Sequence, residues 1–266
     1  MIYHSSFEYI YLWLPLIGFI IGLYGSMLGG GGGFFFIPIL TVIFGVPAQI
    51  SVATSLTATL PICIAGSIGH YRTGNIDLRM GLTFSIFGIL GALAGASLTS
   101  LMTTGQLKTS FGIYSILMAL VMIIIQYKEK KAEKEGTVTQ QNSVYPRIAR
   151  GSFFGFLSGI ITGTFGTSGT APVQAGLFAM HMPVKLVVGT SLMVSTVNNF
   201  SAIGGHFLVG KIDLTLVYFL TAGAVIGALL GPRILAGIKI SRAEGPIRLW
   251  YALGMIIFGI IMIISK

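Results

Sequence analysis

Long apolar runs, separated by short polar connections, dominate the chain from end to end. Residues 9–28 form a first run of 20 residues, which as a helix would reach about 30 Å, the thickness of a bilayer's hydrocarbon core. Further runs of membrane length cover residues 46–71, 78–102 and 107–127. None of these runs alternates with the period of two that a membrane β-barrel requires. The pattern therefore predicts an all-α polytopic membrane protein.

Five consecutive glycines, residues 29–33, interrupt this pattern directly after the first run. Glycine in a helix interior costs about 1 kcal/mol relative to alanine, so five together break the helix. The apolar run that follows, residues 34–44, would span only about 16 Å, roughly half a bilayer. Irregular backbone at membrane depth is tolerated only where it is buried in protein or lines a polar cavity. The break predicts a re-entrant hairpin or an interrupted crossing, and in either case a candidate site.

The second half of the chain repeats the first at an offset of 136 or 137 residues. The glycine-rich break recurs at residues 165–170, as Phe-Gly-Thr-Ser-Gly-Thr, and the Thr-Ser-Leu triplet at 54–56 recurs at 190–192. The two repeats are separated by a charged stretch without apolar periodicity. We accordingly divide the chain into a first repeat at 1–127, a cytoplasmic linker at 128–147 and a second repeat at 148–266.

Basic residues distinguish parallel from inverted repeats. A re-entrant hairpin leaves each half with three further crossings, an odd number, and so inverts the second half. With the linker in the cytoplasm, this arrangement places 13 Lys and Arg residues inside and three outside, whereas parallel repeats give 10 and six. The positive-inside rule favours inversion. We therefore expect two inverted repeats, each a broken-helix hairpin plus three transmembrane helices, with about 8 to 10 helical segments in all. The N-terminus is expected outside.

The composition fits this class and narrows the function. Hydrophobic residues make up 54% of the chain and charged residues 9%, against about 25% charged residues in soluble domains. The net charge is +9, but the Lys and Arg residues that give it lie in the connections between the apolar runs. It therefore does not indicate nucleic-acid binding. The sequence has no zinc motif or phosphate loop, and we expect no metal and no organic cofactor. An intramembrane enzyme would need a nucleophile beside a base, which the motifs do not offer.

The two breaks suggest a site for a small anion. A helix start presents free N–H groups and the positive end of the helix dipole, and two such starts facing each other would hold a negative charge. The alternative is that the glycines only permit close helix packing. Intramembrane hydroxyls and amides could line the site, although hydroxyls also bond their own helix backbone. The candidate substrate-binding residues are Gly30, Gly31, Gly32, Gly33, Phe34, Thr54, Ser55, Thr57, Gly166, Thr167, Ser168, Gly169, Thr170, Ser191, Asn198 and Asn199.

Two equivalent pairs of titratable residues follow the breaks. His70 and His206 could relay protons, but an interfacial place near a helix C-terminus is the favoured interpretation. Asp77 and Asp213 precede apolar helices and are expected to be N-caps.

Several of these motifs together resemble one known family. They are Gly22-x-x-Gly25 leading into Gly29–Gly33 and Pro38, Ala53-Thr-Ser-Leu56, Gly74-x-Ile-Asp77 and Gly91-x-x-x-Gly95. In this combination they resemble the TauE/SafE sulfite exporter family, also called toluene sulfonate uptake permeases. The resemblance implies a secondary transporter that moves sulfite, thiosulfate or an organosulfonate such as sulfoacetate across the bacterial inner membrane. The second break departs from the pattern, because Gly30, Gly31 and Gly33 become Thr167, Ser168 and Thr170.

The alternative function is an anion channel or regulatory anion receptor with the same site but no alternating access. The expected partners are the anionic substrate and membrane lipid. A coupling proton or sodium ion, a homo-oligomer and the direction of transport stay open at this point.

Overall fold

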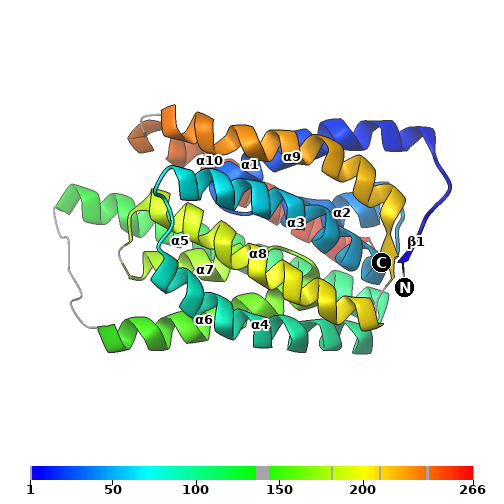
Figure 1. Ribbon diagram of the computed structural model, residues 1–266, viewed down its shortest axis with the longest axis horizontal. Coiled ribbons are helices and arrows are strands. Elements are labelled where there is room, and N and C mark those ends of the chain that lie inside the picture. The colour runs from blue at the N-terminus through cyan, green and yellow to red at the C-terminus, as the bar shows by residue number, and fades with distance from the viewer. Residues whose placement is uncertain (1, 136–143, 181, 210, 238–239, 266) are drawn as a thin grey trace.

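The computed structural model describes residues 2–135, 144–180, 182–209, 211–237 and 240–265, and within them the chain is helical almost throughout. Within these residues six segments, the first at Tyr9–Met27 and the last at Leu214–Ile234, are long and apolar enough to cross a membrane. The helices of the first half are α1 (Leu14–Leu28), α2 (Gly33–Pro38), α3 (Ala48–Arg72), α4 (Leu78–Leu101) and α5 (Thr104–Glu135). Those of the second half are α6 (Val144–Phe165), α7 (Thr170–Phe178), α8 (Val184–Val209), α9 (Leu214–Gly237) and α10 (Ile240–Ile264). The predicted all-α membrane fold is confirmed (Figure 1).

Short non-α segments complete the described chain. A 3-10 helix (Tyr9–Trp13) leads into α1, and a π-helical segment (Ile39–Ile43) continues α2. Strands β1 (Ile2–Tyr3) and β2 (Ile212–Asp213) pair in parallel. Helix also covers both ends of the predicted linker, since α5 continues to Glu135 and α6 begins at Val144, and residues 136–143 lie outside the described residues.

Both glycine breaks form re-entrant hairpins. The rings of Tyr11, before α1, and Phe44, after α2, lie 5.8 Å apart, so the first hairpin begins and ends at the same place. In the second hairpin Arg150, near the start of α6, donates a hydrogen bond of 3.4 Å to the carbonyl of Ala179 after α7. Each hairpin therefore enters and returns on one side, which excludes the interrupted crossing.

The central helices α3 and α8 run antiparallel. The backbone N–H of Asp213, at the start of α9, donates to Thr54 Oγ1 near the start of α3, at 3.1 Å. The N–H of Asp77, at the start of α4, donates to Thr190 Oγ1 near the start of α8, at 2.9 Å. These two bonds lie at opposite ends of the bundle and relate the halves by inversion. We call the end with Asp77 the linker end and the end with Asp213 the terminal end; Figure 1 shows both chain termini near the latter.

Glycine seams hold the repeats together across the pseudo-two-fold axis. Helix α1 packs on α9 of the other repeat, and α6 packs on α4 in the equivalent way. A Cβ added to Gly22 would collide with the carbonyl of Ala224, and one added to Gly159 with the carbonyl of Gly88. Backbones approach this closely only where side chains are absent. Each hairpin is thus held by the fourth helix of the opposite repeat.

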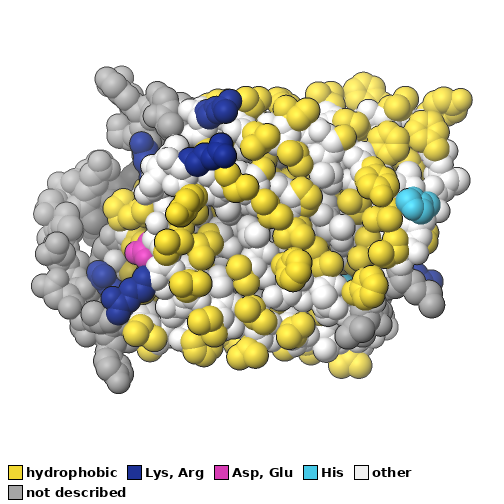
Figure 2. Space-filling model, viewed as in Figure 1, with side chains coloured by type: hydrophobic (Ala, Val, Ile, Leu, Met, Phe, Trp, Pro, Cys, Tyr) yellow, Lys and Arg dark blue, Asp and Glu magenta, His cyan; other side chains and the backbone are white. Residues whose placement is uncertain are grey.

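The surface matches a membrane setting. Apolar side chains cover the middle of the face seen in Figure 2, while the Lys and Arg side chains on that face gather mainly at the linker end. Large exposed apolar residues such as Leu82, Phe153, Tyr218 and Ile226 are each more than half exposed. A soluble monomer rarely leaves so much contiguous apolar surface in water. The apolar band is therefore the lipid-facing surface.

Candidate functional site

The two breaks meet at the centre of the bundle. Ser168 Oγ donates a hydrogen bond to the carbonyl of Gly30, which joins the second break to the first. Ser55 Oγ of α3 lies 3.2 Å from the carbonyl oxygen of Gly33 and 3.0 Å from that of Gly166, so one hydroxyl contacts both breaks. A Cβ added to Gly31 would lie 3.5 Å from the Cβ of Ser168, its equivalent in the other repeat. The breaks thus face each other across the pseudo-two-fold axis.

Glycine is required at the same places in both breaks. Gly29 and its equivalent Gly166 have φ of 76° and 65°, and Gly32 and its equivalent Gly169 have φ of 82° and 57°. Residues with a Cβ rarely adopt this left-handed conformation. Gly32 and Gly169 are the N-caps of α2 and α7, and neither receives a hydrogen bond from a capping side chain. Since glycine has no side chain, neither N-cap residue can accept the first N–H groups of its own helix.

Serine hydroxyls hold the carbonyl groups of the second break. Ser195 Oγ donates to the carbonyl of Ser168 at 2.8 Å, and Ser158 Oγ donates to the carbonyl of Gly169 at 2.7 Å. Four serines contact the breaks, and each is at most 2% exposed: Ser55, Ser158, Ser168 and Ser195. Fixed carbonyl groups keep the loop backbone in one conformation, and they direct the opposite N–H side of each peptide away from these serines.

Two adjacent amides flank the breaks. Asn198 Nδ2 donates to Ser158 Oγ at 2.9 Å, next to the second break. Asn199 Nδ2 lies 3.6 Å from Cys63 Sγ, and Cys63 in turn packs directly on Gly31 of the first break. Both side chains are fully buried, and their Oδ1 atoms have no hydrogen-bond partner among the described residues. The structure thus brings Asn198 and Asn199 to the site, one beside each break.

Other predicted residues are engaged elsewhere. Thr57 and Ser191 donate to carbonyls of their own helices, Ala53 at 2.9 Å and Val187 at 2.6 Å. Thr54 accepts the N–H of Asp213, as described above, and so joins α3 to the other repeat. The ring of Phe34 stacks on Phe111, with centroids 5.4 Å apart. The contacts of these four side chains support helix packing.

Thr167 and Thr170 are the remaining predicted site residues of the second break. Thr167 Oγ1 accepts the N–H of Gly169 at 3.4 Å, so this hydroxyl serves the turn itself. Thr170 begins α7 and is 7% exposed. Two of the three hydroxyl residues that replace glycines here therefore have structural partners. Thr167 stabilises its own turn, and Ser168 bonds the first break.

The two histidines are buried in the protein, not exposed at its surface. His206 Nε2 lies 2.7 Å from the carbonyl oxygen of Gly163 in α6, and His70 Nε2 lies 3.4 Å from that of Ser26 in α1. Their exposed fractions are 2% and 0%, and both occupy the last turns of their helices, as expected from the sequence. Each ring attaches the end of a central helix to the hairpin of the same repeat.

The expected N-caps are present. Asp77 Oδ1 accepts the N–H of Met80 at 3.0 Å, and Asp213 Oδ1 accepts the N–H of Thr215 at 3.0 Å. Side-chain oxygens in these places satisfy the otherwise unpaired donors at the start of a helix. Among the described residues no group of three or more His, Cys, Asp or Glu side chains is placed to bind a metal ion.

Ser158, Ser195, Thr59 and Cys63 contribute to the site but were missed from the sequence. A signal exists for Thr59 and Cys63, because small polar residues recur every four positions along α3, at Ser51, Ser55, Thr59 and Cys63, all buried. This spacing places them on one face of the helix. A search for polar stripes within apolar helices, instead of for motifs, would have found this face.

The fold and the site together define a class of protein, a polytopic helical membrane transporter built from two inverted repeats with broken helices at their interface. The sequence profile of the family described as Sulfite exporter TauE/SafE matches residues 14–262, and the chain belongs to this family. The family and the names of its relatives are those of transporters and not of enzymes.

Similar proteins come from bacteria and archaea. The probable membrane transporter protein YdhB of Bacillus subtilis is 29% identical over 82% of this chain and 87% of its own length. The probable membrane transporter protein MJ0441 of Methanocaldococcus jannaschii is 28% identical over 88% of this chain and 90% of its own. A probable membrane transporter protein of Xylella fastidiosa is 30% identical over 81% of this chain and 80% of its own length. No solved structure matches the chain.

Proposed function

We propose that the protein is a secondary transporter for a small sulfur-containing anion, such as sulfite, thiosulfate or an organosulfonate, in the bacterial inner membrane. The observation that carries the proposal is the contact between the two breaks, where Ser168 bonds Gly30 and Ser55 bonds both Gly33 and Gly166. Two re-entrant hairpins from opposite sides end at one point, which is where inverted-repeat transporters bind their substrates. The family description names sulfite, and this supports a sulfur anion.

The chemistry of the breaks favours an anion. Helices α2 and α7 both begin here, and the first N–H groups of a helix have no intrahelical acceptor. Serine hydroxyls already occupy carbonyl oxygens of both breaks, so a guest meets the donor side of the loops. The helix dipoles add partial positive charge at the same point. Donors without a fixed cation suit an anion that must be released again.

The architecture supports alternating access as the mechanism of this proposed transporter. The Ser168–Gly30 contact closes the two hairpins on each other, and an anion between them would take the place of that contact. Since each hairpin packs on the fourth helix of the other repeat, a rocking motion of the repeats would move the hairpins in opposite senses. The site would then open to one side at a time.

The proposed orientation places the linker end in the cytoplasm. The described basic residues at this end include Arg72, Arg79, Arg147, Arg150, Lys185 and Arg233. Lys108 and Lys211 lie at the terminal end. The positive-inside rule supports this orientation. Cysteines introduced at Gly74 and Gly105, which lie at opposite ends, test this orientation. A membrane-impermeant thiol reagent added to whole cells should label the cysteine at position 105 and not the one at position 74.

Transport assays test the function itself. Purified protein in proteoliposomes should take up sulfite, thiosulfate, sulfoacetate or taurine with saturation, whereas acetate serves as the carboxylate control. A preloaded anion should accelerate uptake of labelled anion, because a carrier exchanges substrate through one site. Uptake that does not saturate and shows no such counterflow would identify a channel instead. Absence of any sulfur-anion flux, with protein correctly inserted, would reject the proposal.

A further inference from the structure

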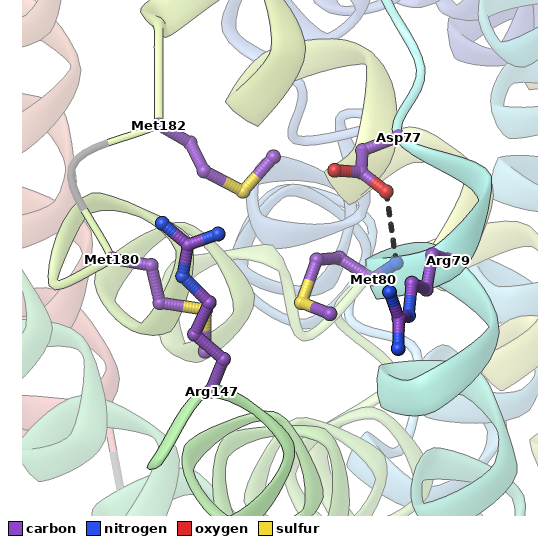
Figure 3. A pocket seen from close by; sticks show the side chains of 6 residues that line it. All are labelled: Asp77, Arg79, Met80, Arg147, Met180 and Met182. Atoms are coloured by element: carbon purple, nitrogen blue, oxygen red, sulfur yellow. Dashed lines mark hydrogen bonds between the residues drawn. The ribbon is translucent and has the colours of Figure 1, made fainter. Parts of the chain in front are cut away.

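A cavity lined by both charged and apolar side chains lies at the linker end, away from the breaks. It has a volume of about 220 Å³ and lies between the starts of α4 and α6 and the segment after α7. Six residues line it, Asp77, Arg79, Met80, Arg147, Met180 and Met182 (Figure 3). Its volume is below the range of about 300–1,000 Å³ typical of pockets for drug-sized ligands. The cavity therefore suits a small molecule.

The charges around the cavity favour an anion. Arg147 extends from the first turn of α6 between Met180 and Met182, and Arg79 lies across from it on α4 (Figure 3). The one carboxylate, Asp77, is committed to α4, since its Oδ1 accepts the N–H of Met80 at 3.0 Å. Two guanidinium groups and one carboxylate therefore line the cavity. Guanidinium groups bind planar or tetrahedral oxyanions through paired hydrogen bonds.

Methionines give the same cavity an apolar wall. Met80 and Met180 are 7% and 3% exposed, and both belong to a buried cluster with Phe84 and Leu177. Met182 packs against this cluster and completes the wall. Methionine side chains adapt to apolar guests of irregular shape. An anion with a short apolar body would therefore use both parts of the cavity, whereas an inorganic anion would use only the arginines.

The equivalent place in the other repeat is built differently. At the terminal end Arg79 is replaced by Thr215 and Arg147 by Ile10. There the N-terminal segment lies over the start of α9: the N–H of Ser5 donates to Asp213 Oδ1 at 3.3 Å, and Thr215 Oγ1 donates to the carbonyl of Ser5 at 3.1 Å. The ring of Phe7 lies 5.8 Å from that of Phe219 in the same region. The guanidinium groups thus belong to one repeat interface only.

We propose that this basic methionine cavity is the docking subsite for the carried anion on the linker side, and that it selects organic sulfonates over inorganic sulfur anions. The sulfonate group binds Arg147 and Arg79, and the apolar part of the anion lies on Met180 and Met182. The inference rests on the proposed function, because it assigns a second subsite on the path of the same substrate. The subsite acts on one side of the membrane only.

Sided transport kinetics test this subsite. Arg147→Gln and Arg79→Gln are reconstituted, and KM and kcat are measured with benzenesulfonate and methanesulfonate offered from the linker side and from the terminal side. We expect KM for both anions to rise about tenfold from the linker side, with KM from the terminal side unchanged. Met182→Ser should raise KM for benzenesulfonate about fivefold and leave that for methanesulfonate as in the wild type. Arg72→Gln, an exposed charge at the same end outside the cavity, is the matched control.

The outcomes separate this inference from the function on which it rests. If the wild type transports and the cavity variants have the same KM values as Arg72→Gln, the subsite is rejected. The proposal for the central site at the breaks is unaffected by that result. No uptake of any sulfur anion by the wild type rejects the proposed function. Should Arg147→Gln not fold, as judged by thermal unfolding, Arg79→Gln and Arg147→Lys carry the test. An equal rise in KM from both sides overturns the sidedness and with it the proposal.

Discussion

The first and second breaks share positive-φ glycines at two equivalent positions but differ in side-chain chemistry, and their comparison separates folding from function. Gly29 and Gly32 keep their glycine in both repeats, as Gly166 and Gly169, and all four have positive φ. By contrast, Gly31 becomes Ser168, and the two face each other at the pseudo-two-fold axis. A Cβ added to Gly31 would collide with Cys63 Sγ, whereas its distance of 3.5 Å to the Cβ of Ser168 is an ordinary contact. The conserved geometry therefore builds the hairpins, and the departure from symmetry fills their centre.

The shared glycines should give the largest effects, and equal ones. A Cβ at Gly29 would lie 2.8 Å from the carbonyl oxygen of Val188, and one at Gly166 would lie 2.6 Å from that of Val52. We expect Gly29→Ala and Gly166→Ala each to abolish transport and lower the midpoint of thermal unfolding, because backbone strain and a clash with a packed helix combine. Uptake in proteoliposomes and a thermal melt measure the two effects.

Gly74→Ala is the control for this pair. Gly74 also has positive φ, at 70°, but an added Cβ would meet nothing within 4 Å. It should therefore cost only the strain of about 1–2 kcal/mol and retain transport. If Gly166→Ala transported as well as Gly74→Ala, close packing of the second break would not be required.

Ser55 and Ser191 offer a sharper comparison, since they are equivalent residues with different partners. Ser55 bonds carbonyls of both breaks, whereas Ser191 bonds only Val187 in its own helix. We expect Ser55→Ala to raise KM for the anion about tenfold, or ~1.4 kcal/mol, because two buried carbonyls lose their donor. Ser191→Ala should stay within about twofold of the wild type. Similar KM values for both variants would contradict the assignment of Ser55 to the site.

Ser168→Gly restores symmetry at the axis and should have a moderate effect. It removes the donor to Gly30 and leaves the positive-φ glycines unchanged. We expect KM to change about three- to fivefold, corresponding to about 1 kcal/mol for one hydrogen bond, with the unfolding midpoint nearly preserved. Thr167→Val, which removes a hydroxyl used within the turn, should change stability more than KM. A larger change in KM for Thr167→Val than for Ser168→Gly would contradict the roles assigned to these two residues.

The histidines should give the smallest effects on transport. His206 lies 2.7 Å from its carbonyl partner and His70 lies 3.4 Å from its own, so His206→Gln should destabilise the protein more than His70→Gln. Both hydrogen bonds attach a helix end to a hairpin, and we expect the pH profile of transport to keep its shape in both variants. A profile that becomes flat in either variant would instead assign that histidine to a proton relay.

The sequence was sufficient for the architecture because the architecture depends on repetition and length. Glycines at one offset predicted the duplication. The half-length run at 34–44 left a hairpin and an interrupted crossing open, and the distribution of basic residues favoured the hairpins. The site was predictable only in part. Thr54 and Ser55 are neighbours in sequence, yet one bonds the N–H of Asp213 and the other bonds the breaks, since successive helix residues point about 100° apart.

Cys63, the chain's single cysteine, provides the most direct test of the central claim that the anion binds where the breaks meet. It is fully buried and packs against Gly31 beside Asn199. The measurement is the rate of N-ethylmaleimide modification of the purified wild-type protein, with and without an unreactive sulfonate such as methanesulfonate. The account predicts that a transported sulfonate slows modification in a saturable way and that acetate does not. An unchanged rate at sulfonate concentrations that saturate transport would contradict it.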